Sequence, residues 1–228
     1  MHVTAILPLP AGDRRRLFTP LAGIPPVVRA ASALTAPAPD GVVVRTVVAA
    51  AGELVDEARR TLAGHGLDAA VTVIDAGAGA TRARCLTAAL DDGAHTHVLV
   101  HDVRRPLAGT AVRDRVLAVL RDGATVALPA LPFTDSAKQT DADGVVRRTV
   151  DRARLRTVQS PRGFTRAELG RLLTAADADF DELTAALTAG AAVVFVDGDA
   201  DAFALELPAD APLVEAVLAA RNPRADRG

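Results

Sequence analysis

Segments typical of β-strands alternate with segments typical of α-helices from the start of the chain, and this order constrains the fold more than any other feature. The strand-like runs are short, apolar and rich in β-branched residues, as expected of strands buried on both faces. They cover residues 2–10, 41–50, 68–76, 96–102 and 124–131, and helical patterns cover 25–36, 52–66, 80–93 and 110–123. Four consecutive β-α units predict an α/β fold with a mostly parallel central sheet and helices on both faces. Ligands bind outside the carboxyl ends of the strands in such a sheet.

The pattern changes after Pro132, where a polar segment alternates like β-strands and contains Asp143-Gly144 as a hairpin turn. Both of its faces are polar, and a two-stranded hairpin without a core is not stable alone in water. We therefore expect a protruding β-arm, at about residues 133–158, that packs on another chain. The chain is predicted to form one domain over residues 1–222, followed by a flexible tail at 223–228. Helical or strand patterns resume at 165–177, 181–190, 191–198, 202–207 and 208–221.

Composition excludes several classes of protein. Aromatic residues make up 3% of the chain, with no Trp or Tyr, so a base-stacking platform for single-stranded nucleic acid is not expected. The net charge of −2 provides no basic field that would attract nucleic acid or acidic lipid. Cys85 is the single cysteine, which rules out an intrachain disulfide and a cysteine-rich zinc site and fits a reducing cytoplasm. The N-terminus lacks the basic region of a signal peptide, and no apolar run approaches the roughly 20 residues of a membrane span.

The stretch VLVHDVRRPL, residues 98–107, places a carboxylate at the predicted carboxyl edge of the sheet. Its apolar strand ends at Asp102, and Pro106 prevents simple continuation of the strand. A carboxylate in this position could hold Mg²⁺ on a polyphosphate. Alternatively, Asp102 could cap a helix or pair with Arg104 or Arg105 in an ordinary loop. The spacing alone leaves both interpretations open.

Two further stretches could bind an anion. In DAGAGATRARC, residues 75–85, small residues turn the chain before a helix, whose free amides suit a phosphate or a polar base edge. A plain β-α turn explains the same pattern. Arg152, Arg154 and Arg156 alternate and would share one face of a strand, where they could bind a phosphorylated substrate. A solvated sheet edge protected by positive charge is the alternative. The five histidines show no zinc-binding pattern.

The first predicted strand leads into LPLPAGDRRRLFTPLAGIP, residues 7–25, which reads as a reduced phosphate-binding loop. Gly12 is its one glycine before the triple arginine, where nucleotide-binding loops have several, and Arg14, Arg15 and Arg16 stand where a lysine is usual. Among the 26 Lys and Arg residues of the chain only Lys138 is a lysine. Any other cation that binds phosphate must therefore be an arginine.

Taken together, these motifs resemble those of the 2-C-methyl-D-erythritol 4-phosphate cytidylyltransferases of the non-mevalonate isoprenoid pathway. VHDVRRPL is similar to the family's V-H-D-A-A-R-P, and GATRARCL is similar to its G-A-x-R-x-x-S-V. The block that runs from LPALPFTDSAKQ to TVQSPRGF is similar, nearly position by position, to P-x-T-D-T-x-K … T-V-D-R-x-x-L-x-x-x-Q-T-P-Q-x-F. The resemblance covers almost the whole chain, and its central block is long and ordered.

The resemblance implies a Rossmann-like nucleotidyltransferase fold and a homodimer in which each chain lends its β-arm to the active site of the other. It implies that CTP and methylerythritol phosphate react, with Mg²⁺, to the CDP-alcohol and pyrophosphate. Asp102 would hold Mg²⁺, with Asp201 near a second acidic metal position, and Arg16 and Arg152 would be catalytic. Nucleotide contacts are expected from Pro8, Gly12, Arg15, Gly79, Ala80, Arg82, Cys85 and Asp102. Contacts to the sugar or polyol phosphate are expected from Arg105, Ser136, Arg152 and Ser160.

The chain departs from the family pattern around the triphosphate. About six residues of the loop motif are missing, the loop lysine falls at or near Arg16, and a second family lysine falls at Ala204. The cytosine-side serine falls at Cys85, and the glutamine of T-P-Q falls at Arg162. Arginine is a planar fork and not a compact point charge, so Arg16 is not an equivalent replacement for lysine. Three functions remain open: an active cytidylyltransferase with a rebuilt loop, a non-catalytic dimeric paralogue, and a nucleotidyltransferase for another sugar or alditol phosphate.

Overall fold

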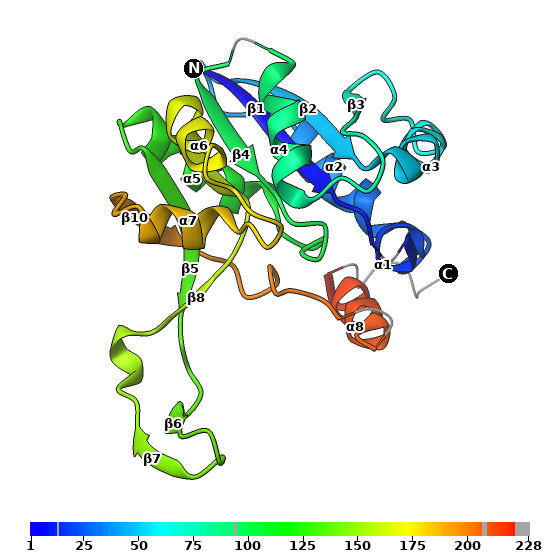
Figure 1. Cartoon of the computed structure of the whole chain (residues 1–228). Coiled ribbons are helices and arrows are strands. Elements are labelled where there is room, and N and C mark those ends of the chain that lie inside the picture. The colour runs from blue at the N-terminus through cyan, green and yellow to red at the C-terminus, as the bar shows by residue number, and fades with distance from the viewer. Residues whose placement is uncertain (13, 94, 207–208, 222–228) are drawn as a thin grey trace.

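A computed structural model describes residues 1–12, 14–93, 95–206 and 209–221, and it contains the predicted mostly parallel sheet (Figure 1). The strands of this sheet are β1 (His2–Leu9), β2 (Val43–Ala50), β3 (Val71–Asp75), β4 (His97–Val100), β5 (Val126–Pro132), β8 (Arg156–Val158), β9 (Arg162–Thr165) and β10 (Val193–Asp197). Their order is β10-β5-β9-β4-β1-β2-β3, with β8 paired to β5 outside this path. All pairs are parallel except those made by β8 and β9.

Helices cover both faces of the sheet, as the β-α alternation predicts. The helices of the described residues are α1 (Arg14–Phe18), α2 (Pro26–Thr35), α3 (Gly52–Ala63), α4 (Arg82–Asp91), α5 (Thr110–Arg121), α6 (Arg166–Leu173), α7 (Glu182–Thr188) and α8 (Ala211–Arg221), of which α8 lies away from the sheet (Figure 1). Helix α2 contacts α3 and α5, whereas α4 contacts α6, which contacts α7, and these last three lie in front of the sheet in Figure 1. Among the described residues, none of the helices has the length and apolar character needed to cross a bilayer.

The centre of the sheet is its most deeply buried part. Residues 3–9 of β1 are buried, and Val98, Leu99 and Val100 of β4 have no exposed surface. Because β1 and β4 are adjacent and parallel, their carboxyl ends reach the same edge of the sheet. The core consists mainly of Ala, Val and Leu, with Phe164 as its fully buried aromatic residue among those described. A rigid apolar centre thus fixes the position of the loop that follows β4.

Strand β9 was not predicted, because RGFT is too short to give a strand pattern. It runs antiparallel between β4 and β5 and pairs Arg162 with Val100. A Cβ atom on Gly163 would lie 2.6 Å from Val116 Cγ1 and 2.7 Å from Leu120 Cδ1, so a side chain here would clash with α5. Glycine therefore allows α5 to pack directly on β9. The pairing delivers Arg162 to the end of β4, beside the loop that carries Asp102.

The predicted β-arm is present and extends away from the body of the molecule (Figure 1). Strands β6 (Lys138–Thr140) and β7 (Val146–Thr149) are antiparallel and exposed, with a register shift between Gln139 and Thr140. Asp141 Oδ1 accepts bonds from the amides of Asp143 and Val145 at 3.1 and 3.0 Å, and Gly144 has a φ of +79°. This left-handed conformation explains the Asp-Gly pair that predicted the turn.

Two local predictions were wrong. Arg152 and Arg154 lie in a 3₁₀ turn, Arg152–Arg154, and Arg156 begins β8, so the three do not share one face of a strand. The side chain of Asp151 accepts a bond from the Ala153 amide at 3.0 Å and caps this turn.

The segment predicted as a strand at 202–207 is irregular where it is described. The Leu205 amide donates to the Arg104 carbonyl at 2.8 Å, which ties the segment to the loop after β4 and not to the sheet. Residue 207 of this segment, residue 208 at the start of the next predicted helix, and the predicted tail at 223–228 lie outside the described residues.

Candidate active site

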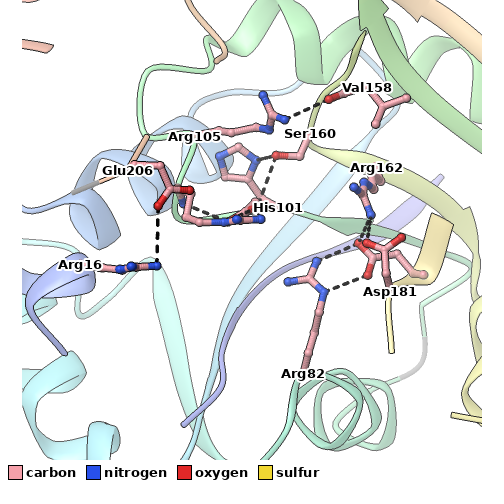
Figure 2. A network of polar contacts seen from close by, with 12 residues as sticks. Arg16, Arg82, His101, Arg105, Val158, Ser160, Arg162, Asp181 and Glu206 are labelled. Atoms are coloured by element: carbon pink, nitrogen blue, oxygen red, sulfur yellow. Dashed lines mark hydrogen bonds and ion pairs between the residues drawn. The ribbon is translucent and has the colours of Figure 1, made fainter. Parts of the chain in front are cut away.

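A small pocket at the carboxyl edge of the sheet collects charged residues from four parts of the fold (Figure 2). It has a volume of about 120 Å³. The first turn of α4 provides one arginine, and the loop after β4 provides Asp102 and two arginines. Strand β9 provides a fourth arginine, and the N-cap of α7 provides a second carboxylate. The lining residues are Arg82, Asp102, Arg104, Arg105, Ser160, Arg162 and Asp181. Four arginines around two carboxylates make this pocket suited to a multiply charged anion.

Asp102 is the carboxylate at the centre of the loop after β4. Its oxygens accept bonds from Arg104 Nε at 3.0 and 3.2 Å, from Arg104 Nη2 at 2.7 Å, and from the Arg104 amide at 2.9 Å. Burial acts to raise the pKa of Asp102, but the bonds and charge of Arg104, with the charge of Arg82, outweigh burial and lower the pKa to about 2. The carboxylate is therefore ionised at neutral pH. The ion pair that the sequence offered as an alternative is present, and it sits inside the pocket.

Ser160 and His101 hold the backbone of this loop through hydrogen bonds. Ser160 Oγ accepts a bond from the Asp102 amide at 3.2 Å and lies 3.0 Å from His101 Nδ1 (Figure 2). Burial lowers the pKa of His101 to about 4, although the charge of Asp102 acts in the opposite direction. His101 is therefore neutral at physiological pH, and its contact with Ser160 fixes the backbone of Asp102. Ser160 lines the pocket with its hydroxyl already engaged, and its role in substrate binding stays a prediction.

Two more arginines are held by carbonyls and carboxylates around the pocket. Arg105 donates to the carbonyls of Ala202 at 2.5 Å and Val158 at 2.9 Å, and burial lowers its pKa. Arg16 Nη1 lies 3.9 Å from Glu206 Oε2, and the charge of Glu206 also helps to raise the pKa of Arg104, behind the stronger effect of Asp102. Glu206 thus lies between the first loop and the loop that carries Asp102 (Figure 2).

The glycine-rich turn before α4 adopts the conformation that its sequence predicts. Gly77 and Gly79 have φ values of +94° and +61°. The Gly79 amide donates to Glu53 Oε2 at 3.1 Å, and the Ala80 carbonyl accepts from the Ala11 amide at 2.9 Å. The turn therefore lies against the first loop, as a nucleotide site built from both would require.

Cys85 lies on α4 below this turn and has no exposed surface. Burial raises the pKa of its thiol to about 11, against a backbone hydrogen bond at Leu9 and the charge of Arg82. Its predicted role in nucleotide binding stays a prediction, and burial limits that role to packing beneath the turn.

We expect Cys85 to react with a disulfide reagent at pH 8 at least about 100-fold more slowly in the folded protein than in denaturant, because the thiol is buried and protonated. The measurement is the release of the coloured thiolate from the reagent, with and without guanidinium. Equal rates in the two conditions would show that α4 opens to solvent and would contradict this placement.

The first loop differs from the predicted phosphate loop, because residues Arg14–Phe18 form the short helix α1. Arg14 forms an ion pair with Glu57 of α3, and Gly12 and Arg15 line a separate open hollow with Glu57. Pro8 is buried in β1 beside Ala49. Arg14 also lines the open hollow, whereas Arg16 lies near Glu206, so the triple arginine is divided between two places.

Three further predicted site residues, from the arm and the C-terminal part of the chain, also lie apart from the pocket around Asp102. Ser136 and Arg152 are exposed on the arm, where Arg152 donates to the Thr134 carbonyl. Asp201 pairs with Arg221 of α8 at 2.6 Å. The metal role of Asp201 and the substrate roles of the arm residues stay predictions.

The prediction also missed Glu182 and gave Arg162 and Asp181 no role in the site. Arg82 donates from Nε and Nη2 to Glu182 at 2.9 and 2.8 Å, and Arg162 donates to Asp181 at 2.6 Å and to Glu182 at 3.1 Å. Burial lowers the pKa of Arg82, but Glu182 more than offsets burial, so the pKa lies above its ordinary value. Arg82 is 100 residues from Glu182 in the chain, so no local pattern could pair them. The one clue in the sequence was Arg162, which stands where the family motif has glutamine.

Comparison with known proteins identifies the family. The model of the 2-C-methyl-D-erythritol 4-phosphate cytidylyltransferase family matches residues 11–220. The chain belongs to this family. It is 37% identical to the enzyme of that name from Frankia casuarinae over 99% of this chain and 84% of the relative. It is 39% identical to the corresponding protein from Nocardia farcinica, over 89% of this chain and 85% of the relative.

Solved structures of family members share the fold. The crystal structure of the Thermus thermophilus 2-C-methyl-D-erythritol 4-phosphate cytidylyltransferase superposes with a TM-score of 0.71, at 26% identity, over 93% of this chain and 97% of the other. The 4-diphosphocytidyl-2C-methyl-D-erythritol synthase from Anaerococcus prevotii superposes with a TM-score of 0.77 over 95% of each chain, and at 18% identity it supports the fold alone. The predicted family and its nucleotidyltransferase fold are therefore confirmed.

Proposed function

We propose that this protein transfers the cytidylyl group of CTP to 2-C-methyl-D-erythritol 4-phosphate and releases pyrophosphate. The observation that carries the proposal is the pocket at the end of β4, where an ionised Asp102 lies among Arg82, Arg104, Arg105 and Arg162. This pocket occurs in a chain that belongs to the cytidylyltransferase family. In the reaction, a phosphate oxygen of the acceptor forms a bond to the α-phosphorus of CTP, and the bond from that phosphorus to the bridging oxygen of pyrophosphate breaks.

Asp102 is suited to hold Mg²⁺. Mg²⁺ is commonly bound by one or two carboxylates together with substrate phosphates and water. The described residues contain no group of three or more histidine, cysteine or acidic side chains that could hold a metal without the substrate. A single ionised carboxylate beside a phosphate pocket fits that requirement. When bound there, Mg²⁺ would neutralise charge on the triphosphate.

The arginines of the pocket would stabilise the charge that develops at the α-phosphorus. Preorganised cations in a site that excludes water act strongly on such charge. Arg105 is fixed by the carbonyls of Ala202 and Val158, so it would bind an incoming phosphate without much loss of side-chain freedom. Arg16 lies 3.9 Å from Glu206 and would contribute if a triphosphate displaced that carboxylate.

The exposed arm motivates the homodimer in this proposal. Ser136 and Arg152 lie on the arm, which extends away from the body of its own chain (Figure 1). In a dimer with exchanged arms, these residues would bind the acceptor phosphate in the site of the partner subunit. The arm also exposes Val145 and Val146, which a second chain would cover.

The test is the release of pyrophosphate by purified protein from CTP, Mg²⁺ and methylerythritol phosphate, with identification of the CDP-alcohol product. We expect release that requires all three components, that fails with chelator, and that is slower with ATP, GTP or UTP. Sedimentation of the same sample is expected to give a dimer. A dimer that neither binds CTP nor releases pyrophosphate would support the non-catalytic paralogue. Release only with another alditol phosphate would assign a different acceptor.

A further inference from the structure

Glu182 is the first residue of α7 and has no exposed surface. Burying a carboxylate is unfavourable unless it is paired and hydrogen-bonded. Its partners come from two distant parts of the chain, α4 and β9. The carboxylate therefore joins three elements behind the wall of the pocket.

Arg82 is held by Glu182 through a two-pronged contact. Its Nε and Nη2 atoms donate to Oε2 and Oε1 of Glu182 at 2.9 and 2.8 Å, which fixes the plane of the guanidinium. Arg162 Nη1 reaches the same Oε1 atom at 3.1 Å and also donates to Asp181 at 2.6 Å. Arginines and carboxylates alternate in this cluster (Figure 2), which we call the Glu182 cluster: Arg82, Glu182, Arg162 and Asp181.

The position of Arg82 on its helix shows why it needs such a partner. It is the first residue of α4, where the positive end of the helix dipole disfavours a cation, and no acidic residue lies in that turn. Arg82 still faces the pocket, because it lines the cavity together with Asp102 and Ser160. Glu182 thus stabilises an arginine at a place where the helix itself would repel it.

We propose that Glu182 is a positioning residue that orients Arg82 for binding of the nucleotide. This inference rests on the proposed function, since it takes CTP as the ligand of the pocket. The two-pronged contact sets the orientation of the Arg82 fork before the ligand arrives, and Arg162 restrains the carboxylate from its other side. The expected effect of losing Glu182 therefore falls on CTP affinity and not on the acceptor.

The experiment compares Glu182→Gln, Arg82→Ala and the double variant in CTP binding by calorimetry and in steady-state turnover. Glutamine keeps the size of the side chain but loses its charge and one acceptor oxygen. We expect Glu182→Gln to raise the dissociation constant and the KM for CTP by roughly tenfold to a hundredfold. The KM for methylerythritol phosphate should change less than about threefold. In the Arg82→Ala background, Glu182→Gln should raise the dissociation constant for CTP by a further factor of less than about three, because the carboxylate acts through this arginine.

Two further variants separate positioning from folding. Arg82→Lys keeps a charge beside Glu182 but cannot form the two-pronged contact, so it should lose CTP affinity while its thermal unfolding stays near that of the wild type. Glu168→Gln is the matched control, because Glu168 also binds an arginine, Arg171, with bonds of 3.0 and 2.6 Å, but on the surface of α6. That control should bind CTP like the wild type.

Several outcomes would overturn the inference. If the Glu182→Gln protein binds CTP as tightly as the wild type, Glu182 does not position Arg82, and the proposed function is unaffected. Equal losses from Glu182→Gln in the wild-type and Arg82→Ala backgrounds would show that Glu182 acts on the fold as a whole. A wild-type protein that does not bind CTP would overturn both the inference and the proposed function.

Discussion

Replacement of Asp102 by asparagine is expected to lower pyrophosphate release by at least about 100-fold, the scale on which loss of one preorganised electrostatic group slows an enzyme. Asparagine keeps the shape of the side chain but removes the charge that would hold Mg²⁺. It also removes the counter-charge of Arg104, whose Nε and Nη2 both bind the carboxylate. The measurement is the rate of pyrophosphate release at saturating CTP, methylerythritol phosphate and Mg²⁺.

Asp92→Asn provides the matched control for this variant. Asp92 also accepts a bond from an arginine, Arg45 Nη2 at 2.6 Å, but it lies at the C-terminal end of α4, away from the pocket. We expect this control to turn over at the wild-type rate. Full activity of the Asp102→Asn protein would show that the Asp102 carboxylate is not needed for the reaction.

The pKa of Asp102 adds a dependence on pH with a defined direction. In the folded protein this pKa is lowered from 3.8 to about 2, so folding favours the ionised form. The stabilisation is fully present above about pH 5 and is lost as the pH falls from about 4 to about 2. Protonation of Asp102 should therefore not limit activity between pH 5 and pH 9.

The sequence predicted the parts of this molecule that depend on local pattern. The apolar strands, the helices between them and the Asp143-Gly144 turn each have a signal within about 10 residues. Asp102 was identified in the same way, because it stands at the end of a buried strand pattern. These features need no knowledge of distant contacts.

The missed features depend on contacts between distant segments. Strand β9 has four residues and exists because β4 and β5 both pair with it. Glu182 lies at the start of a short helix and would read as an ordinary first-turn acid, although its partner Arg82 is 100 residues away. The role of Arg162 was hidden for the same reason. Only the folded arrangement places these side chains around one pocket.

Replacement of Arg113 by leucine is expected to destabilise the protein by about 3–5 kcal/mol, the cost typical of breaking a buried charged network. Arg113 lies on α5 and is 1% exposed. Its Nη1 donates to the carbonyls of Ala33 and Ala36 at 3.0 and 2.7 Å, and its Nη2 donates to the Pro37 carbonyl at 2.7 Å. These carbonyls lie at the C-terminal end of α2, where a cation also complements the helix dipole.

Leucine would leave these partly buried carbonyls without their arginine donor, which is the main source of the expected loss. For a chain of this size each kcal/mol lowers Tm by roughly 2–4 °C, so Tm should fall by about 10 °C. Thermal unfolding followed by circular dichroism provides the measurement. Arg121→Leu is the control, because Arg121 is exposed on the same helix, and it should change stability by no more than about 0.5 kcal/mol. Equal melting of Arg113→Leu and Arg121→Leu would show that α2 does not depend on this buried arginine for its C-terminal cap.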